Sequence, residues 1–460
     1  MPNLFRLNLD TGIFIFLNCN SFVTKVLYDK NETSNRLQKS KKRKGIFMKR
    51  KAWFFLFLAF VLVISSACTN SDTTEDTKDN EGKVPVSGTG EEGGTIKIGV
   101  LASLTGALES YGKQTQRGFD LGIEYATDGT MEVAGKKIEI IYEDTETKPE
   151  VAVQKATKLL EDDEVDFLVG SSSSGDTLAV LPLAEEYEKI MVVEPAVADS
   201  ITGAEFNPYI FRTSRNSSQD AVAGAAAIAK PGVKIATFAP DYSFGLDGVA
   251  AFKKAAEKLG AEIVLEEYAD PAATDFTSNL QKVIQAKPDY LFVVWAGANS
   301  PWNQIADLKI QEKGIKISTG APDIPALSTM EPLVGMEGFS VYYHTLPDND
   351  VNDWLVEKHK EKFNGEVPDL FTPGGMSAAI SIIEALKKSE GNADGNELIG
   401  IMEGMSFDTP KGTMTFREDD HQALQTLYSI KLEKQEGIDY PVPVLIRELS
   451  PEETEPPIQN

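Results

Sequence analysis

Residues 167–175 read FLVGSSSSG, an unbroken apolar run followed at once by four serines between two glycines. A run that is apolar on both faces is typical of a strand buried between two layers of helices. A second run of this kind, YLFVVWA, occupies residues 290–296. Amphipathic, helix-like stretches flank the first run at 149–161 and 177–189. Strands and helices in alternation predict a parallel α/β fold.

The alternation occurs twice along the chain. In the first set, strands are predicted at 96–101, 137–142, 165–169, 190–193 and 209–212. In the second set they are predicted at 233–238, 262–267, 290–295, 316–319 and 338–343. Helices are predicted between them at 114–126, 149–161, 177–189, 219–229, 245–259, 274–286 and 301–312. The segment 216–220 between the sets is polar and lacks a strand, so the pattern indicates two doubly wound parallel-sheet lobes.

Residues 350–425 are mostly helical and too short for a third domain. Helices are predicted at 353–363, 376–389 and 396–402, and hairpin-like strands at 412–416 and 427–432. We therefore assign residues 95–214 and 344–425 to lobe 1, and 215–343 and 426–449 to lobe 2. The chain then crosses between the lobes three times. The last residues, 450–460 (SPEETEPPIQN), are predicted to be a disordered tail.

The sequence before residue 95 resembles a targeting segment. Three basic residues at 49–51 precede an apolar run at 52–64 and the small residues SSA, as in a secretory signal. The run is too short for a membrane span, which needs about 20 residues. Cys68 then stands where bacterial lipoproteins carry the cysteine that receives a diacylglyceryl group. The alternative is an ordinary signal peptide that ends near a cysteine.

These features predict a division of the N-terminal part of the chain. Residues 48–67 form the signal peptide, and 68–94 form a lipidated cysteine with a flexible, acidic, glycine-rich tether. A signal of this kind begins its chain, so we expect Met48 to be the true start. Residues 1–47 are then a mis-assigned upstream extension.

Composition excludes several classes of function. The 460 residues contain 70 acidic and 45 basic side chains, for a net charge of −25. Residues 1–67 hold 12 of the basic and three of the acidic residues, so the rest of the chain carries −34. A surface this acidic repels nucleic acid. Two cysteines and three histidines give no disulfide framework and no zinc pattern, so no metal or cofactor is expected.

Five segments in order resemble one known family. They are GVLASLTGALESYGKQTQRGFDLGIE at 99–124, IEIIYEDTETKPEVAVQKATKLLEDDEVDFLVGSSSSG at 138–175, EPAVADSIT at 194–202, APDYSFGLDG at 239–248 and FDTPKGTMTFREDDHQALQTLYSIKLE at 407–433. Together they resemble the leucine/isoleucine/valine-binding family, the type I periplasmic binding proteins of ABC importers. The resemblance spans residues 95–447. It implies a monomeric receptor, anchored outside the cytoplasmic membrane, that captures a small solute between its lobes and delivers it to a membrane permease.

The serine turn is the first part of the predicted site. In the family this loop binds the carboxylate of the ligand, which singles out Ser173 and Ser174, with Ser172 beside them. Hydroxyl and backbone N–H groups at a helix start suit an anion. A serine cap in a solvated turn is the alternative interpretation.

The remaining site residues also follow from the resemblance. Ala196 and Ala198 lie where the family uses backbone groups and a threonine, so Ala198 removes one polar contact. Asp323 lies where the family pairs a carboxylate with a ligand ammonium, although it is also a plausible turn residue after Pro322. The predicted apolar walls are Tyr111, Tyr242, Phe244, Trp295 and Phe371. Ligand candidates are a neutral or branched amino acid, or a small aromatic or aliphatic carboxylate.

Two other functions remain open at this stage. One is a ligand sensor of the same fold that signals to a membrane receptor or kinase. The other is a secreted hydrolase that uses the serine turn, with His421 as the candidate general base. The sequence has no G-x-S-x-G elbow and no P-loop motif, so we expect no enzymatic activity.

Overall fold

The computed structural model describes residues 93–297 and 299–460, all within one compact unit, Thr89–Asn460. The predicted upstream extension, the signal peptide and Cys68 lie outside the described residues, as does most of the predicted tether. Within the part of the chain that the structure describes, no helix has both the length and the hydropathy to cross a membrane.

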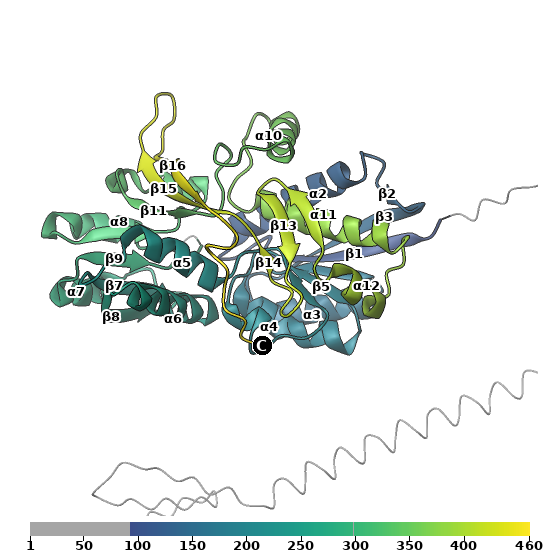
Figure 1. Cartoon of the computed structure of the whole chain (residues 1–460), viewed down its shortest axis with the longest axis horizontal. Helices are drawn as coiled ribbons and strands as arrows, with labels where there is room; N and C mark the ends of the chain where they lie inside the picture. The colour runs from purple at the N-terminus through teal and green to yellow at the C-terminus, as the bar shows by residue number, and fades with distance from the viewer. Residues whose placement is uncertain (1–92, 298) are drawn as a thin grey trace, which may run out of the picture. The chain divides into compact units, whose positions relative to one another are not determined.

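The first sheet has six strands in the order β2-β3-β1-β4-β5-β6 (Figure 1). The strands are β1 (Thr95–Ala102), β2 (Glu132–Val133), β3 (Lys136–Asp144), β4 (Phe167–Gly170), β5 (Ile190–Val193) and β6 (Ile210–Arg212). All neighbours are parallel except the short β2, which runs antiparallel to β3. All four residues of β4 are buried, as the FLVG run predicted.

Helices cover both faces of this sheet. They are α2 (Glu109–Ala126), α3 (Pro149–Glu161), α4 (Ser174–Glu186), α10 (Asp350–Lys362), α11 (Thr372–Lys388) and α12 (Gly395–Met402). Helices α2 and α11 lie in backbone contact because glycines face each other across the interface. A Cβ on Gly118 would stand 1.8 Å from the Thr372 carbonyl oxygen, and one on Gly375 would stand 2.1 Å from that of Thr115.

The second sheet has four parallel strands in the order β10-β9-β7-β8. They are β7 (Lys234–Pro240), β8 (Glu262–Ala269), β9 (Tyr290–Val293) and β10 (Lys316–Thr319). Its helices are α5 (Ser217–Ile228), α6 (Ser243–Lys258), α7 (Thr277–Ala286), α8 (Trp302–Asp307) and α9 (Ile324–Leu327). A capping box between Asn216 and Gln219 starts α5 at the polar segment that separates the two sets. The α/β class with parallel sheets is confirmed.

Antiparallel strands complete the molecule. A bridge between Gly320 and Phe339 joins β10 to β11 (Glu337–Ser340), which pairs with β15 (Leu427–Glu433) and β16 (Val442–Leu449). A separate sheet is formed by β12 (Ser406–Thr409), β13 (Gly412–Phe416) and β14 (Ala423–Leu424). The first hydrophobic core takes in α11, α12 and β12–β14, so these elements pack with β1–β6.

We call β1–β6 with α2–α4 and α10–β14 the first lobe, and β7–β11 with α5–α9, β15 and β16 the second lobe. Both lie side by side in Figure 1. The order of elements matches the predicted alternation, but several boundaries differ, and two of these lie next to the site. Helix α2 begins at Glu109, five residues before the predicted 114. Strand β9 ends at Val293 because the residues after it leave the sheet and line the pocket described below.

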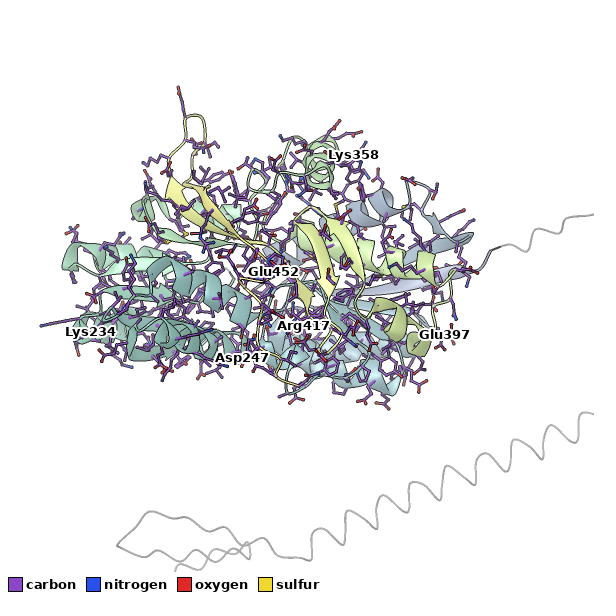
Figure 2. The ribbon with its side chains drawn as sticks, in the orientation of Figure 1. Lys234, Asp247, Lys358, Glu397, Arg417 and Glu452 are labelled. Atoms are coloured by element: carbon purple, nitrogen blue, oxygen red, sulfur yellow. The ribbon has the colours of Figure 1, made fainter. Side chains whose placement is uncertain are left out.

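The predicted disordered tail, 450–460, is instead placed against both lobes. Arg417 donates a hydrogen bond of 2.7 Å to the Pro456 carbonyl oxygen, and Asn460 donates one of 2.6 Å to that of Asp419. The Thr454 side chain is fully buried. Arg417 lies near the junction of the lobes in Figure 2. The acidic composition suggested disorder, but Arg417 supplies a cation that pairs with Glu455.

Candidate functional site

A pocket of about 90 Å³ opens between the two lobes. A site for one water needs about 10–15 Å³, so this pocket has room for roughly six to nine water-sized groups. Its walls come from loops that follow β4, β5, β9 and β10. Ligands of open α/β sheets bind beyond the carboxyl ends of the strands, and the pocket has this position in both lobes.

Eight of the eleven predicted ligand-binding residues line the pocket. They are Tyr111, Ser172, Ser174, Ala196, Tyr242, Phe244, Trp295 and Phe371. The polar lining residues that the sequence did not single out are Arg215, Ser217, Asp220 and Thr319. The structure shows that these side chains share one cavity; their contact with a ligand stays a prediction.

The serine turn joins the loop that follows β5. Ser174 Oγ accepts hydrogen bonds from the backbone N–H groups of Val197 (3.3 Å) and Ala198 (3.2 Å). Ser172 Oγ accepts one from the Ser103 backbone N–H at 3.0 Å. Each hydroxyl that accepts from the backbone keeps its own O–H for donation. The hydroxyls of Ser172 and Ser174 can therefore donate hydrogen bonds into the pocket from fixed positions.

Two predicted residues lie behind this wall rather than in it. Ser173 is the N-cap of α4, where its hydroxyl accepts from the Asp176 backbone N–H. Ala198 is fully buried, and its carbonyl oxygen accepts a hydrogen bond of 2.6 Å from Arg212. Neither is among the lining residues. A small side chain at 198 fits this packed position, which the resemblance alone did not reveal.

Aromatic side chains form most of the apolar wall. Tyr111 and Phe371 of the first lobe have ring centroids 4.5 Å apart, and those of Tyr242 and Phe244 of the second lobe are 5.8 Å apart. The Trp295 ring packs on Phe238 and Phe276, while its Nε1 donates to the Asn299 carbonyl oxygen at 2.7 Å. Flat, rigid rings give apolar contact area at low cost in rotamer entropy. The pocket thus suits a ligand with an aromatic or branched body.

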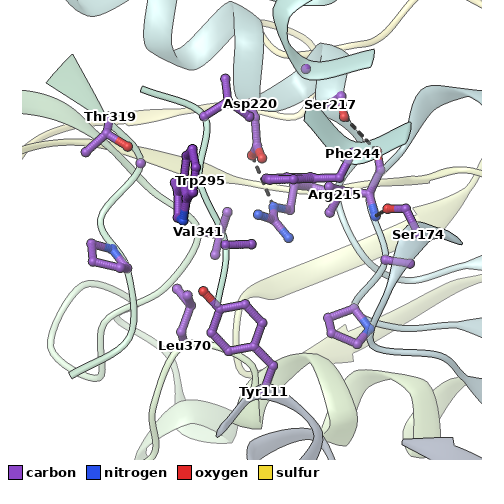
Figure 3. Close-up of a pocket in the computed structure, with 18 of the residues that line it drawn as sticks. Tyr111, Ser174, Arg215, Ser217, Asp220, Phe244, Trp295, Thr319, Val341 and Leu370 are labelled. Carbon is purple, nitrogen blue, oxygen red and sulfur yellow. Dashed lines mark hydrogen bonds and ion pairs between the residues drawn. The ribbon is translucent and has the colours of Figure 1, made fainter. Parts of the chain in front are cut away.

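An ion pair supplies the charge in the pocket. Arg215 Nε donates to Asp220 Oδ1 at 3.1 Å, and both side chains are largely buried. In Figure 3 the Arg215 guanidinium lies beside the Phe244 ring and extends toward the space between Tyr111 and Trp295. Among the described residues, only its Nε has a hydrogen-bond acceptor. Its two terminal NH₂ groups are thus oriented for a planar anion such as a carboxylate.

More charges lie buried behind this pair. Lys411 and Glu194 are both almost completely buried. Burial raises the pKa of Glu194 although the Lys411 ammonium opposes the shift, and burial also raises the pKa of Asp220. Burial also lowers the pKa of Lys411 to about 8, against the attraction of the Glu194 carboxylate, so each of these two groups favours the charged form of the other.

Asp323 lies outside the pocket. Its side chain is buried and accepts hydrogen bonds from Ser110 Oγ (2.6 Å) and Gln114 Nε2 (3.3 Å) of α2. The acidic residue that does line the pocket is Asp220. No motif pointed to Arg215 and Asp220, because they lie in the short polar segment between the two sets of strands.

The three histidines of the described residues do not line the pocket. His421 stacks on Phe211 with centroids 4.0 Å apart, and its Nδ1 lies 2.9 Å from the Ile210 carbonyl oxygen. Burial lowers the pKa values of His344, His359 and His421. No histidine is among the described residues that line the pocket, and those residues hold no cluster of three or more metal-ligating side chains.

Comparison with known proteins agrees with this architecture. Residues 95–437 match the sequence profile of the Periplasmic binding protein family. An ABC-type branched-chain amino acid transporter structure from Rhodopseudomonas palustris is 47% identical, covers 79% of this chain and 99% of its own, and superposes with a TM-score of 0.71.

Two further relatives widen the range of named ligands. A solute-binding protein of an ABC transporter from R. palustris, solved with 3,4-dihydroxybenzoic acid, is 31% identical over 77% of this chain and 97% of its own (TM-score 0.69). The leucine-, isoleucine-, valine-, threonine- and alanine-binding protein of Pseudomonas aeruginosa is 26% identical over 70% of this chain and 86% of its own. The chain therefore belongs to the periplasmic binding protein family, as an extracytoplasmic substrate-binding protein of the leucine/isoleucine/valine-binding type that serves ABC transporters.

Proposed function

We propose that this protein captures a small carboxylate with an aromatic or branched apolar body and delivers it to a membrane permease for import. The observation that carries the proposal is the Arg215 guanidinium, which extends into an aromatic pocket with two NH₂ groups available. A bidentate pair with a carboxylate uses both groups. The hydroxyls of Ser172 and Ser174 add donors on the facing wall.

A second candidate ligand is an α-amino acid, and Asp220 is the observation that favours it. One of its carboxylate oxygens accepts from Arg215, which leaves the other oxygen for a ligand ammonium. The two ligand classes differ in charge, since an amino acid brings no net charge and a simple carboxylate brings one negative charge. The named ligands of the relatives include both classes.

A thermal-shift screen of the purified protein against benzoates, branched-chain amino acids and short aliphatic acids tests the proposal. A ligand at 100 times its Kd stabilises the folded state by about 2.7 kcal/mol and raises Tm. Benzoate-type or branched carboxylates are expected to raise Tm, and Asp220→Asn is expected to leave this response in place. A response confined to amino acids and lost in Asp220→Asn would favour the second candidate.

The anchoring of the protein is part of the same proposal. Residues 48–67 serve as the signal peptide, and Cys68 carries a diacylglyceryl group that holds the protein at the outer face of the cytoplasmic membrane. Two acyl chains give stable anchoring where one does not. In cells fed labelled palmitate, the wild-type protein is expected to carry label in the membrane fraction. Cys68→Ala is expected to remove the label and release the protein; unchanged labelling would contradict the assignment.

Recovery of the ligand tests transport against the other functions. After prolonged incubation with the protein, chromatography is expected to return the ligand unaltered. Turnover that Ser174→Ala abolishes would instead indicate a hydrolase. Loss of labelled-ligand uptake in cells that lack the gene supports import, whereas unchanged uptake with a lost transcriptional response to the ligand would indicate a sensor.

A further inference from the structure

Two buried carboxylates connect the lobes at the edge of the pocket. Asp323 belongs to the second lobe and accepts hydrogen bonds from Ser110 and Gln114 of the first lobe. Asp369 belongs to the first lobe, and both of its oxygens lie 3.1 Å from the Ile324 backbone N–H of the second lobe. Each lobe thus donates to a carboxylate of the other.

Gln114 ties this arrangement together. Its Nε2 lies 3.3 Å from Asp323 Oδ2 and 3.2 Å from Asp369 Oδ2, so one amide group spans the two carboxylates. Its Oε1 accepts a hydrogen bond of 3.0 Å from the backbone N–H of Phe371, a pocket-lining residue. The wall of the pocket is therefore linked directly to the contact between the lobes.

We propose that Ser110, Gln114, Asp323 and Asp369 form a reciprocal latch that holds the two lobes closed over the ligand. These are positioning residues, because none of them lines the pocket. The latch accounts for the position of Asp323, which the family resemblance suggested as the ammonium partner but which bonds to α2 and does not line the pocket. Hydrogen bonds between separate lobes are lost on opening, so they stabilise only the closed form.

The latch also makes closure sensitive to pH. Burial and the neighbouring Asp323 carboxylate raise the pKa of Asp369 to about 7, and burial raises the pKa of Asp323. The other titratable groups that face the pair are Tyr111, Lys113, Arg117, Tyr342, Tyr343, His359, Glu366 and Tyr440. Lys113 pairs with Glu109 and Arg117 with Glu366.

The sign follows from linkage. On opening, Asp369 returns to water, where an aspartate has a pKa of about 3.9. Its pKa is thus higher in the closed form, so closure takes up a proton. The contribution of Asp369 to closure is complete below about pH 4 and is lost as pH rises through 7. The affinity for the ligand then falls by at most tenfold per pH unit. A carboxylate ligand stays ionised above pH 5.5, so its own titration does not produce this trend.

The test has two readouts, of which only the affinity depends on the proposed function. Small-angle X-ray scattering of the ligand-free protein gives the radius of gyration, and calorimetry gives Kd for the best carboxylate of the screen, both at pH 5.5 and 8. The wild type is expected to be more compact and to bind more tightly at pH 5.5. Asp369→Asn, which keeps an oxygen for the Ile324 N–H, is expected to be compact at both pH values.

Ser110→Ala is expected to weaken binding about tenfold at both pH values, as the loss of a hydrogen bond to a charged acceptor. Ser278→Ala, on the exposed surface of α7, is the matched control and is expected to bind like the wild type. Unchanged radius and Kd in Ser110→Ala and Asp369→Asn would overturn the latch. Loss of amino-acid binding alone in Asp323→Asn would also overturn it, in favour of an ammonium site.

If no compound of the screen binds, the proposed function fails while the scattering comparison still decides the latch. A ligand-free wild type that is more compact at pH 5.5 than at pH 8, with Asp369→Asn insensitive to pH, supports it. Equal radii for both proteins at both pH values would refute it.

Discussion

The Arg212 guanidinium donates a hydrogen bond of 2.6 Å to the carbonyl oxygen of Ala198. Its other nitrogens bind Gln422 at 2.6 Å and Thr202. Arg212 is fully buried, and burial lowers its pKa to about 10, still well above neutral. One buried cation therefore joins β6, the loop after β5 and the turn between β13 and β14, and so supports the pocket wall from behind.

Arg212→Met is expected to destabilise the protein severely. It removes three hydrogen bonds that a buried cation donates, each worth about 1 kcal/mol or more, so a loss of about 3–5 kcal/mol is expected. The midpoint of urea unfolding measures the change. Arg447→Met, at a half-exposed position on β16, is the control and is expected to leave the midpoint unchanged. Equal midpoints for the two variants would contradict the supporting role.

Gly297→Ala is expected to weaken ligand binding by impeding closure. Gly297 has a φ of +87°, and a Cβ there would stand 2.8 Å from the Ala107 carbonyl oxygen of the other lobe. Its backbone N–H also donates to the Tyr111 hydroxyl at 3.3 Å. The expected rise in Kd is about tenfold, measured by calorimetry, from strain of about 1–2 kcal/mol.

A matched glycine separates closure from backbone strain. Gly335 has a φ of +92°, and a Cβ there meets no atom within 4 Å. Gly335→Ala is therefore expected to lower Tm as Gly297→Ala does, but to keep the wild-type Kd. The same Kd in both variants would show that the approach of Gly297 to Ala107 plays no part in binding.

Asp176→Asn is expected to stabilise the protein at high pH. The Asp176 carboxylate is fully buried, and neither oxygen has a hydrogen-bond partner among the described residues. Burial raises its pKa to about 6, above the unfolded value of about 3.9. The contribution of protonated Asp176 to the free energy of unfolding is thus intact below about pH 4 and is lost as pH rises through 6.

Thermal unfolding at pH 5 and pH 8 checks this prediction. The advantage of Asp176→Asn over the wild type is expected to grow toward pH 8, to about 1–3 kcal/mol. Asp162→Asn, at the exposed end of α3, is the control. An advantage for Asp176→Asn that is constant across this range would exclude the buried carboxylate as its cause.

Arg215→Met is expected to lower affinity for a carboxylate ligand about 100-fold. The variant removes two charge-assisted hydrogen bonds, together worth about 2–3 kcal/mol. Arg215→Lys keeps the charge but not the planar fork, so an intermediate loss is expected. Because Arg215→Met leaves Asp220 unpaired, the double variant Arg215→Met/Asp220→Asn restores neutrality. Calorimetry that returns wild-type affinity for the double variant would contradict the role of Arg215.

The order of the parallel strands and their helices was predictable because these strands carry a local signal, whereas the antiparallel β2, β12, β14 and β16 were not predicted. Runs such as FLVG are apolar on both faces, and the structure buries them between helices. The end of β9 was not predictable from hydropathy. The apolar run continues to Ala296, but its last residues serve as pocket wall rather than as sheet.

The site was predictable only where the sequence carried a motif. The serine turn and the aromatic positions line the pocket. The position of the Asp323 side chain depends on a hydrogen bond from Ser110, which is 213 positions away in the sequence. Arg215 pairs with Asp220 in a short polar segment that carries no motif. Contacts over such distances are set by how the lobes meet, which no local pattern encodes.

We expect Arg215 to recognise a carboxylate in the pocket. Calorimetry of the wild-type protein with the best carboxylate of the screen and with its neutral primary amide, which has nearly the same shape, measures this recognition. The carboxylate is expected to bind at least tenfold more tightly than the amide, and this preference is expected to disappear in Arg215→Met. Equal affinity of the wild type for the two compounds, or tighter binding of the amide, would contradict it.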